Sequence, residues 1–203
     1  MALIGLCGGS GSGKGAVSQL LSSREIPVVD ADAVYHRLTS HMSDCLAELA
    51  SAFGDSIIRD GALDRSVLRG IVFADKDKRL LLNKISHRHV LLEMRAEVAR
   101  HIKEGASLVF VDAPLLFESG LDKDCDFIVA VIADRSTRIE RIILRDGISR
   151  SDAEARINSQ ISDDALKERA DYVVINDGSL VELDEAVEGL LTYLKKTEVG
   201  QNV

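Results

Sequence analysis

A run of glycines and serines that ends in a lysine is the first feature of this sequence that could do chemistry. In order, its residues are Gly8, Gly9, Ser10, Gly11, Ser12, Gly13 and Lys14. Glycines let successive backbone N–H groups face an anion, a following helix adds the positive end of its dipole, and a lysine can reach the outer phosphates of a nucleotide. The run matches the P-loop pattern GxxxxGK[ST] up to its last position. We therefore expect a nucleotide-phosphate site here, against the alternative of a plain glycine-rich turn.

The last position of this pattern departs from the rule. Gly15, followed by Ala16, stands where a Ser or Thr hydroxyl ordinarily binds Mg²⁺. Two interpretations follow: the metal is held by water and carboxylates alone, or the protein binds nucleotide with reduced catalysis. We favour the first because the other residues expected for phosphoryl transfer are present.

Two aspartates follow the apolar segment 26–29, which we expect to be a strand. Ligands of open α/β sheets bind at the carboxyl ends of strands, and residues at i and i+2 of an extended segment point the same way. Asp30 could serve a metal through water, while Asp32 accepts a proton from a hydroxyl nucleophile. The alternative for Asp32 is that it only caps the next helix.

A second strand end is also acidic. The apolar segment 107–111 leads to Asp112, and Glu118 follows six residues later. An aspartate in this position could orient a metal-bound water. Glu118 could contact substrate or a lid, and a plain surface role for it is equally open.

Arginines are dense between residues 135 and 156. Arg138, Arg141 and Arg145 are spaced to share one helical face, and Glu140 is the one acid that falls among them. Neutralisation within the cluster should therefore be poor, which favours a phosphate-facing role over a solvated surface. Two interpretations concern other residues: the histidines do not form a metal site, and Phe53, Phe73 and Phe110 belong to the core.

The elements expected around these residues indicate an α/β fold of the P-loop NTPase type, a parallel sheet with helices on both faces. Apolar segments 2–7, 26–29, 107–111, 127–132 and 172–175 predict strands. Segments 16–21, 33–39 and 179–196 predict helices. From 43 to 104 the pattern is helical, longest over 78–103, with breaks near Gly54 and Gly61 and no evident strand.

Composition limits the classes of function. A net charge of −8 disfavours a nucleic-acid binder, and no apolar run approaches the roughly 20 residues that span a bilayer. Three scattered cysteines and no basic leader at the first residues favour a reducing cytoplasm over export. We expect no membrane partner, and the oligomeric state is left open.

These motifs together resemble the dephospho-coenzyme A kinase family over most of the chain, from Ile4 to Asn176. The matching segments include the P-loop, Val29 to Asp32 with Arg37, Phe53-Gly54, Gly61 with Leu63 to Arg65, Val72-Phe73, Asp112 to Glu118, Arg156-Ile157 with Gln160, and Ala170 to Tyr172. The chain departs from the family pattern at Cys7, at Gly15 and Ala16, and at Arg88. The ordered set of short segments is specific to the family.

The resemblance implies ATP and Mg²⁺, and phosphorylation of the ribose 3′-hydroxyl of dephospho-coenzyme A. It implies one P-loop kinase domain over 1–203, with a helical substrate-binding insertion at about 40–104 and a lid at about 135–160. Catalysis would rest on Lys14, Asp32, Arg138 and Arg141. The nucleotide would be bound by Gly9, Gly11, Ser12, Gly13, Lys14, Gly15, Ala16 and Asn176. The substrate would be bound by Asp32, Arg37, His87, Asp112, Leu115 and Glu118, and the metal, through water, by Asp30 and Asp112.

Two other functions stay open. One is a kinase for another small hydroxyl compound, such as a nucleoside or a shikimate-like acid. The other is a nucleotide-binding protein that has lost catalysis, which Gly15 would explain.

Overall fold

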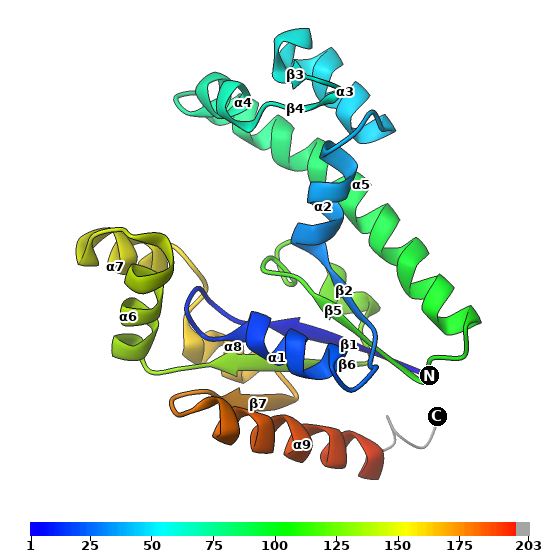
Figure 1. Cartoon of the computed structure of the whole chain (residues 1–203), viewed down its shortest axis with the longest axis vertical. Helices are drawn as coiled ribbons and strands as arrows, with labels where there is room; N and C mark the ends of the chain where they lie inside the picture. Colours follow the sequence, from blue (N-terminus) through cyan, green and yellow to red (C-terminus); the bar gives the residue numbers. More distant parts are fainter. Residues whose placement is uncertain (198–203) are drawn as a thin grey trace. The chain divides into compact units, whose positions relative to one another are not determined.

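The central sheet has five strands in the order β2-β5-β1-β6-β7 (Figure 1). The structure, a computed structural model, describes residues 1–197. The strands are β1 (Ala2–Cys7), β2 (Val28–Asp30), β5 (Leu108–Asp112), β6 (Phe127–Ile132) and β7 (Tyr172–Ile175). Strand β1 runs parallel to β5 and β6, and β6 runs parallel to β7. The predicted parallel α/β sheet is confirmed, and three of its strands have the predicted bounds.

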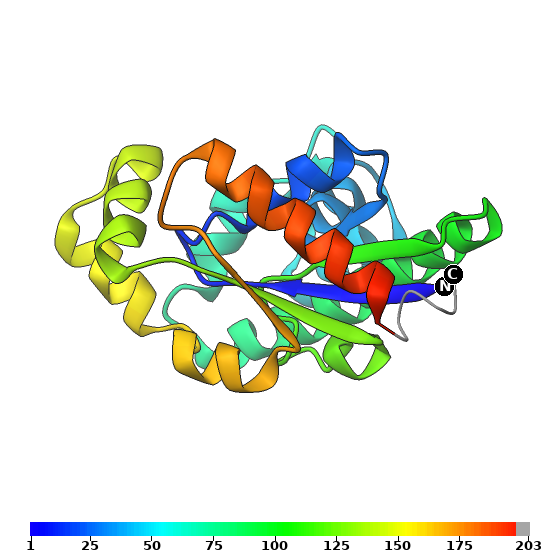
Figure 2. The ribbon, with the colours of Figure 1, turned by 90° about the horizontal axis from the view of Figure 1, so that it is seen from below.

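The chain divides into two compact units, of which the first carries this sheet. The first unit comprises Met1–Val29 and Arg100–Val203. Its helices are α1 (Lys14–Ser22), the 3₁₀ helix η2 (Leu121–Asp124), α6 (Arg135–Asp146), α7 (Arg150–Asn158), α8 (Asp163–Arg169) and α9 (Leu180–Lys196). Helix α9 begins at a capping box in which Ser179 and Glu182 bond each other's backbone amides. In Figure 2, α9 lies across the strands of the sheet.

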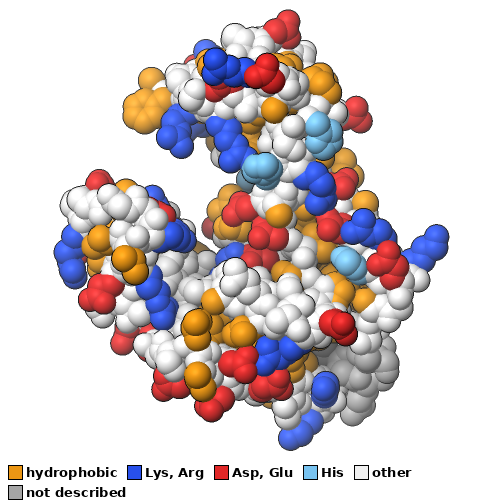
Figure 3. All heavy atoms as spheres, in the orientation of Figure 1, with side chains coloured by type: hydrophobic (Ala, Val, Ile, Leu, Met, Phe, Trp, Pro, Cys, Tyr) orange, Lys and Arg blue, Asp and Glu red, His pale blue; other side chains and the backbone are white. Residues whose placement is uncertain are grey.

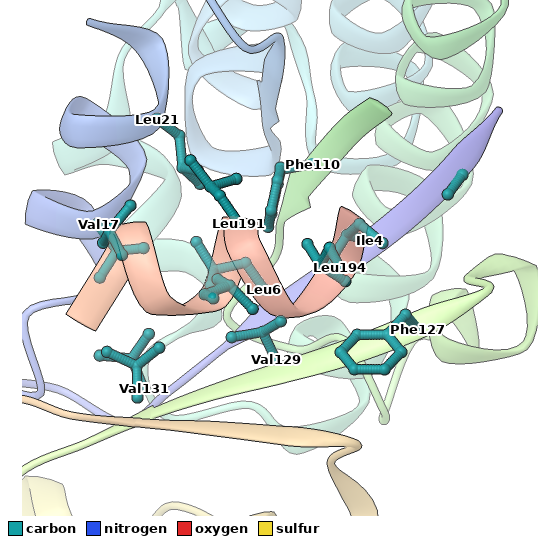
Figure 4. Close-up of a cluster of buried hydrophobic side chains, with 14 of the residues drawn as sticks. Ile4, Leu6, Val17, Leu21, Phe110, Phe127, Val129, Val131, Leu191 and Leu194 are labelled. Carbon is teal, nitrogen blue, oxygen red and sulfur yellow. The ribbon is translucent and has the colours of Figure 1, made fainter. Parts of the chain in front are cut away.

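The main hydrophobic core lies between the sheet and helices α1 and α9 (Figure 4). Because side chains alternate along a strand, Ile4 and Leu6 of β1 face this core, together with Leu21 and Leu191 of the two helices. The intervening Gly5 faces the opposite side. A Cβ at Gly5 would lie 2.9 Å from the Leu116 side chain, so the segment after β5 packs directly on that face. Strand β1 is thus buried on both faces, and its end is held rigidly where the glycine-rich loop begins.

The second unit, Asp30–Ala99, is mostly helical. Its elements are α2 (Ala31–Thr39), α3 (Asp44–Phe53), the 3₁₀ helix η1 (Asp55–Ile57), β3 (Ile58–Arg59), β4 (Ala62–Leu63), α4 (Arg65–Val72) and α5, which runs over Lys76–Lys103 and past the unit's end. Six of its buried side chains form one hydrophobic cluster: Cys45, Leu49, Ile57, Leu68, Val72 and Ile85. None of the helices in residues 1–197 combines the length and apolar character needed to cross a bilayer.

Two expectations for this unit are wrong. The segment 43–104 contains a small antiparallel hairpin, β3–β4, which turns at Asp60 and Gly61 with φ of 52° and 79°. Strands of two residues are too short to show alternation, although an Asp-Gly pair is a typical hairpin turn. Phe73 is 77% exposed and not part of the core, whereas Phe110 is fully buried as expected. Phe53 packs against the edge of the unit's core.

Candidate active site

The glycine-rich loop between β1 and α1 adopts conformations that only glycine takes readily. Gly11 and Gly13 have φ of 79° and 92°. A Cβ on Gly13 would collide with the side-chain amide of Asn176, and one on Gly9 would collide with the guanidinium of Arg138. These positions therefore require glycine, and the loop can bring its backbone close to a phosphate group. The helix that follows adds the positive end of its dipole.

Four side chains hold this loop from outside, and we call them the P-loop latch: Arg138, Arg141, Gln160 and Asn176. Three successive loop carbonyls accept from the latch: Ser10 O from Arg138 Nε at 2.9 Å, Gly11 O from Arg141 at 3.4 Å, and Ser12 O from Asn176 Nδ2 at 2.8 Å. Gln160 Oε1 accepts from the Ser10 amide at 2.9 Å. The amides of Ala16 and Val17 bond the Gly13 carbonyl oxygen at 2.9 and 3.2 Å, so the helix begins at the loop itself and the positive end of its dipole lies where an anion would bind.

The loop lysine meets a buried carboxylate. Lys14 Nζ forms an ion pair with Asp112 Oδ1, and Asp112 is only 2% exposed at the end of β5. Ser18 Oγ donates to Asp112 Oδ2 at 2.6 Å. Register explains this meeting, because Leu6 of β1 pairs with Asp112, so the strand ends lie side by side. Sequence motifs predicted Lys14 and Asp112 but not Ser18, whose one signal was a hydroxyl four residues after the lysine.

The residues around Lys14 fit a nucleotide and its metal, and not a preformed metal centre. Within the part of the chain that the structure describes, Ser12 Oγ is fully buried without a hydrogen-bond partner, and a Cβ at Gly15 would meet nothing within 4 Å. In residues 1–197 no group of three or more His, Cys, Asp or Glu side chains is arranged to hold a metal ion. This suits Mg²⁺, which takes one or two carboxylates, substrate phosphates and several waters. Ala16, expected at the nucleotide, packs against the hydrophobic core.

The aspartate pair lies in the second unit and differs from the extended pair that we expected. Asp30 is the N-cap of α2, and its Oδ1 accepts from the amides of Asp32 at 2.8 Å and Ala33 at 3.1 Å. The cap is therefore Asp30 and not Asp32. Because the helix begins at Ala31, the two side chains do not share one extended segment. Capping occupies one oxygen of Asp30, whereas the Asp32 carboxylate accepts no hydrogen bond within the described chain.

The other residues expected at the substrate are distributed over both units. Arg37 of α2 pairs with Glu97 at 2.7 Å within the second unit, and His87 is half-buried on α5. Leu115 and Glu118 follow β5 in the first unit, and both are exposed. Their roles in substrate binding stay predictions.

Poor neutralisation of the arginine cluster was a wrong expectation. Arg138 is 2% exposed and pairs with Asp163 at 2.7 Å. Hydrogen bonds from Arg145, and then from Arg156, lower the pKa of Asp146 to about 2. Neither Asp146 nor Asp163 belongs to the i, i+3, i+7 pattern of the arginines along the helix. Asp163 lies far along the sequence, and only the fold brings it to Arg138. The arginines and these acids thus form a network of ion pairs that holds Arg138 of the latch in place and joins helix α6 to helix α7.

The site combines a parallel sheet, a P-loop at the start of α1, and a buried strand-end aspartate beside the loop lysine. These features define a nucleotide-binding protein of the P-loop kinase class. Comparisons with known proteins narrow this class. The dephospho-CoA kinase family model matches residues 2–182. A curated dephospho-CoA kinase from Anaeromyxobacter dehalogenans is 42% identical over 96% of this chain and 93% of its own length. One from Bacillus cereus is 39% identical over 93% of this chain and 95% of its own length. The chain belongs to the dephospho-CoA kinase family.

Solved structures agree with this fold. The protein TT1252 from Thermus thermophilus superposes with a TM-score of 0.79 at 34% identity, covering 95% of this chain and 97% of that one. A dephospho-CoA kinase from Campylobacter jejuni gives 0.72 at 23% identity, with 96% and 97% covered. A shikimate kinase from Acinetobacter baumannii gives 0.53 at 16% identity, which shows a shared fold only.

Proposed function

We propose that this chain transfers the γ-phosphoryl group of ATP to the ribose 3′-hydroxyl of dephospho-coenzyme A. A bond forms between the 3′-oxygen and the γ-phosphorus, and the bond from that phosphorus to the β–γ bridging oxygen breaks. ADP leaves with the bridging electrons, and the hydroxyl proton passes to Asp32. The products are coenzyme A and ADP.

The P-loop with its latch, in a chain of this family, is the observation that carries the proposal. The loop amides and Lys14 would neutralise the transferring phosphoryl group, because phosphoryl transfer is catalysed mainly by positioning and charge stabilisation. Lys14 would exchange Asp112 for the phosphates when ATP binds. Asp32, whose carboxylate no hydrogen bond occupies in the described chain, is the better proton acceptor of the aspartate pair.

The remaining residues have supporting roles in this proposal. When bound with ATP, Mg²⁺ supplies neutralisation of the β- and γ-phosphate charge. Asp112 would hold the Mg²⁺ ion through waters, together with the Asp30 oxygen that does not cap α2. The helical second unit would bind dephospho-coenzyme A, and helices α6 and α7 would act as a lid that excludes water from ATP.

Small molecules in the cytoplasm are the partners we propose. On the face drawn in Figure 3, basic and acidic side chains are interspersed, and the net charge of −8 disfavours nucleic acid. Cys7, Cys45 and Cys125 are all free thiols, which supports a reducing compartment.

Coupled ADP release with dephospho-coenzyme A as acceptor tests the function, with the product identified by mass spectrometry. We expect turnover with this acceptor, and little with shikimate, a nucleoside or water. Lys14→Ala enzyme is the matched blank. Turnover with another acceptor would show a different kinase. ATP binding without turnover at any Mg²⁺ concentration would show a nucleotide-binding protein instead.

A further inference from the structure

We propose that Ser18 holds Asp112 in place of the hydroxyl that the P-loop lacks at position 15; this rests on the proposed function. In a complete motif, that hydroxyl both binds the metal and lies beside the strand-end aspartate. Here Gly15 and Ala16 have none. The space beside Gly15 is open, since a Cβ there would meet nothing within 4 Å, so no other side chain has replaced the lost one.

Ser18 lies on the same face of α1 as Lys14, one turn later. Its Oγ is 2.6 Å from Asp112 Oδ2 and 3.2 Å from the carbonyl oxygen of Lys14. A hydroxyl has one proton to donate, and the shorter bond to a carboxylate is the stronger one. Its proton therefore goes to Asp112.

Both oxygens of Asp112 are thus occupied, and the two bonds behave differently when a nucleotide binds. Lys14 on Oδ1 must turn to the phosphates, whereas Ser18 on Oδ2 has no other task in the proposed reaction. Ser18 would keep the buried carboxylate oriented toward a metal-bound water after the lysine leaves. It is a positioning residue for Asp112, and direct coordination at position 15 is left to water.

Metal binding to the ADP complex tests this role without needing the second substrate. Mn²⁺ would replace Mg²⁺, its free fraction being followed by electron paramagnetic resonance, and ADP affinity would be measured separately in EDTA. We expect Ser18→Ala to raise the Kd for Mn²⁺ about tenfold, the usual order for loss of a residue that orients a metal ligand. ADP affinity without metal should stay unchanged, because the partners of this hydroxyl, the Asp112 carboxylate and the Lys14 carbonyl oxygen, are acceptors that do not bind phosphate oxygens.

Three further variants make the test specific. Ser18→Thr keeps the hydroxyl and should bind Mn²⁺ like the natural chain. Gly15→Ser in the Ser18→Ala background should recover most of the affinity, because a hydroxyl then enters the open space beside Lys14. Ser23→Ala removes a hydroxyl that donates to the carbonyl oxygen of Leu20 at 2.8 Å, and it should leave Mn²⁺ affinity unchanged.

Two results would overturn the proposal. One is a Ser18→Ala protein with natural Mn²⁺ affinity. The other is an equal loss of metal-free ADP affinity and metal affinity that Gly15→Ser does not repair, since that would be general damage to α1. Inactivity of the natural chain toward dephospho-coenzyme A would contradict the proposed function and leave these binding results unaffected.

Discussion

The Lys14–Asp112 pair makes catalysis and stability depend on the same two side chains. Lys14→Ala should lower kcat at least a hundredfold, the usual order for loss of a charge contact in the transition state. It should also destabilise the fold by about 3 kcal/mol, because a carboxylate that is 3% exposed loses its cation. Urea denaturation and steady-state kinetics measure the two effects.

Adding Asp112→Asn to Lys14→Ala separates these effects. The double variant should recover much of the free energy of unfolding, since the buried charge is gone, and none of the kcat. Lys123→Ala, at an exposed lysine of η2, is the control for removing a positive charge. A Lys14→Ala enzyme with more than about a tenth of the natural kcat would contradict the assignment.

The aspartate pair allows a matched comparison of charge at two neighbouring positions. Asp32→Asn should lower kcat by roughly 10²–10⁴ with unchanged ATP affinity, because the proposed general base is lost. Asp30→Asn keeps a good N-cap for α2, so it removes charge without removing the cap, and its effect should be mild. If Asp30→Asn is the damaging change in single-turnover kinetics, the two roles are reversed.

Sequence patterns predicted the groups whose chemistry is local, and missed those that only the fold brings together. Lys14 and the glycines carry their own motif, and Asp112 ends a strand. Ser18 has no motif, and it becomes meaningful only because β1 and β5 are neighbours in the sheet. Asp30 was placed at the correct strand end, but periodicity could not show that the helix starts one residue later.

Among the elements, α6 acts on the P-loop through its buried arginine. Arg138 holds Ser10 O and also pairs with Asp163 of α8, so one guanidinium joins the loop to two helices. Arg138→Ala should raise KM for ATP and lower kcat, roughly 10²-fold in kcat/KM, because a loop displaced by about 1 Å loses alignment. KM for dephospho-coenzyme A should not change.

Two control variants test whether the effect of Arg138→Ala comes from the bonds that its guanidinium makes. Arg150→Ala removes an exposed arginine whose ion pair in the described part of the chain is with Glu154 of its own helix, and it should leave the kinetics unchanged. Arg138→Lys should not rescue, since a lysine cannot make the forked bonds of a guanidinium. Natural KM for ATP in Arg138→Ala would show that the latch is only structural.

At the scale of helices and strands, the sequence predicted each strand of the large sheet and the long helices of the chain, because their apolar periodicity extends over several residues. It missed the β3–β4 hairpin, whose strands have two residues each. It also placed Phe73 in the core, because composition alone does not show that the residue follows the last turn of α4 and is exposed.

The whole molecule consists of two units with separate cores, and its thiols can report on each. Burial raises the pKa of Cys7, in the first unit, to about 12, and it also raises the pKa of Cys45, in the second. Only a thiolate is alkylated readily, so at pH 8 the folded protein should react slowly at both positions. Unfolding removes the burial and should make both reactive.

We expect the two thiols to become reactive at different urea concentrations. Among the residues that the structure describes, the second unit has eleven buried hydrophobic residues against thirty in the first, and a smaller core leaves a smaller margin of stability. Cys45 should therefore be alkylated at lower urea than Cys7, as measured by iodoacetamide labelling and peptide mass spectrometry.

Nucleotide binding distinguishes separate unfolding from a single transition. ATP held by the P-loop stabilises the unit that contains it, by about 2.7 kcal/mol at a hundred times its Kd. Reactivity of Cys7 should then move to higher urea, while that of Cys45 stays in place if the second unit unfolds alone. Coincident labelling of both thiols, moving together when ATP is added, would show that the two units unfold as one cooperative body despite their separate cores.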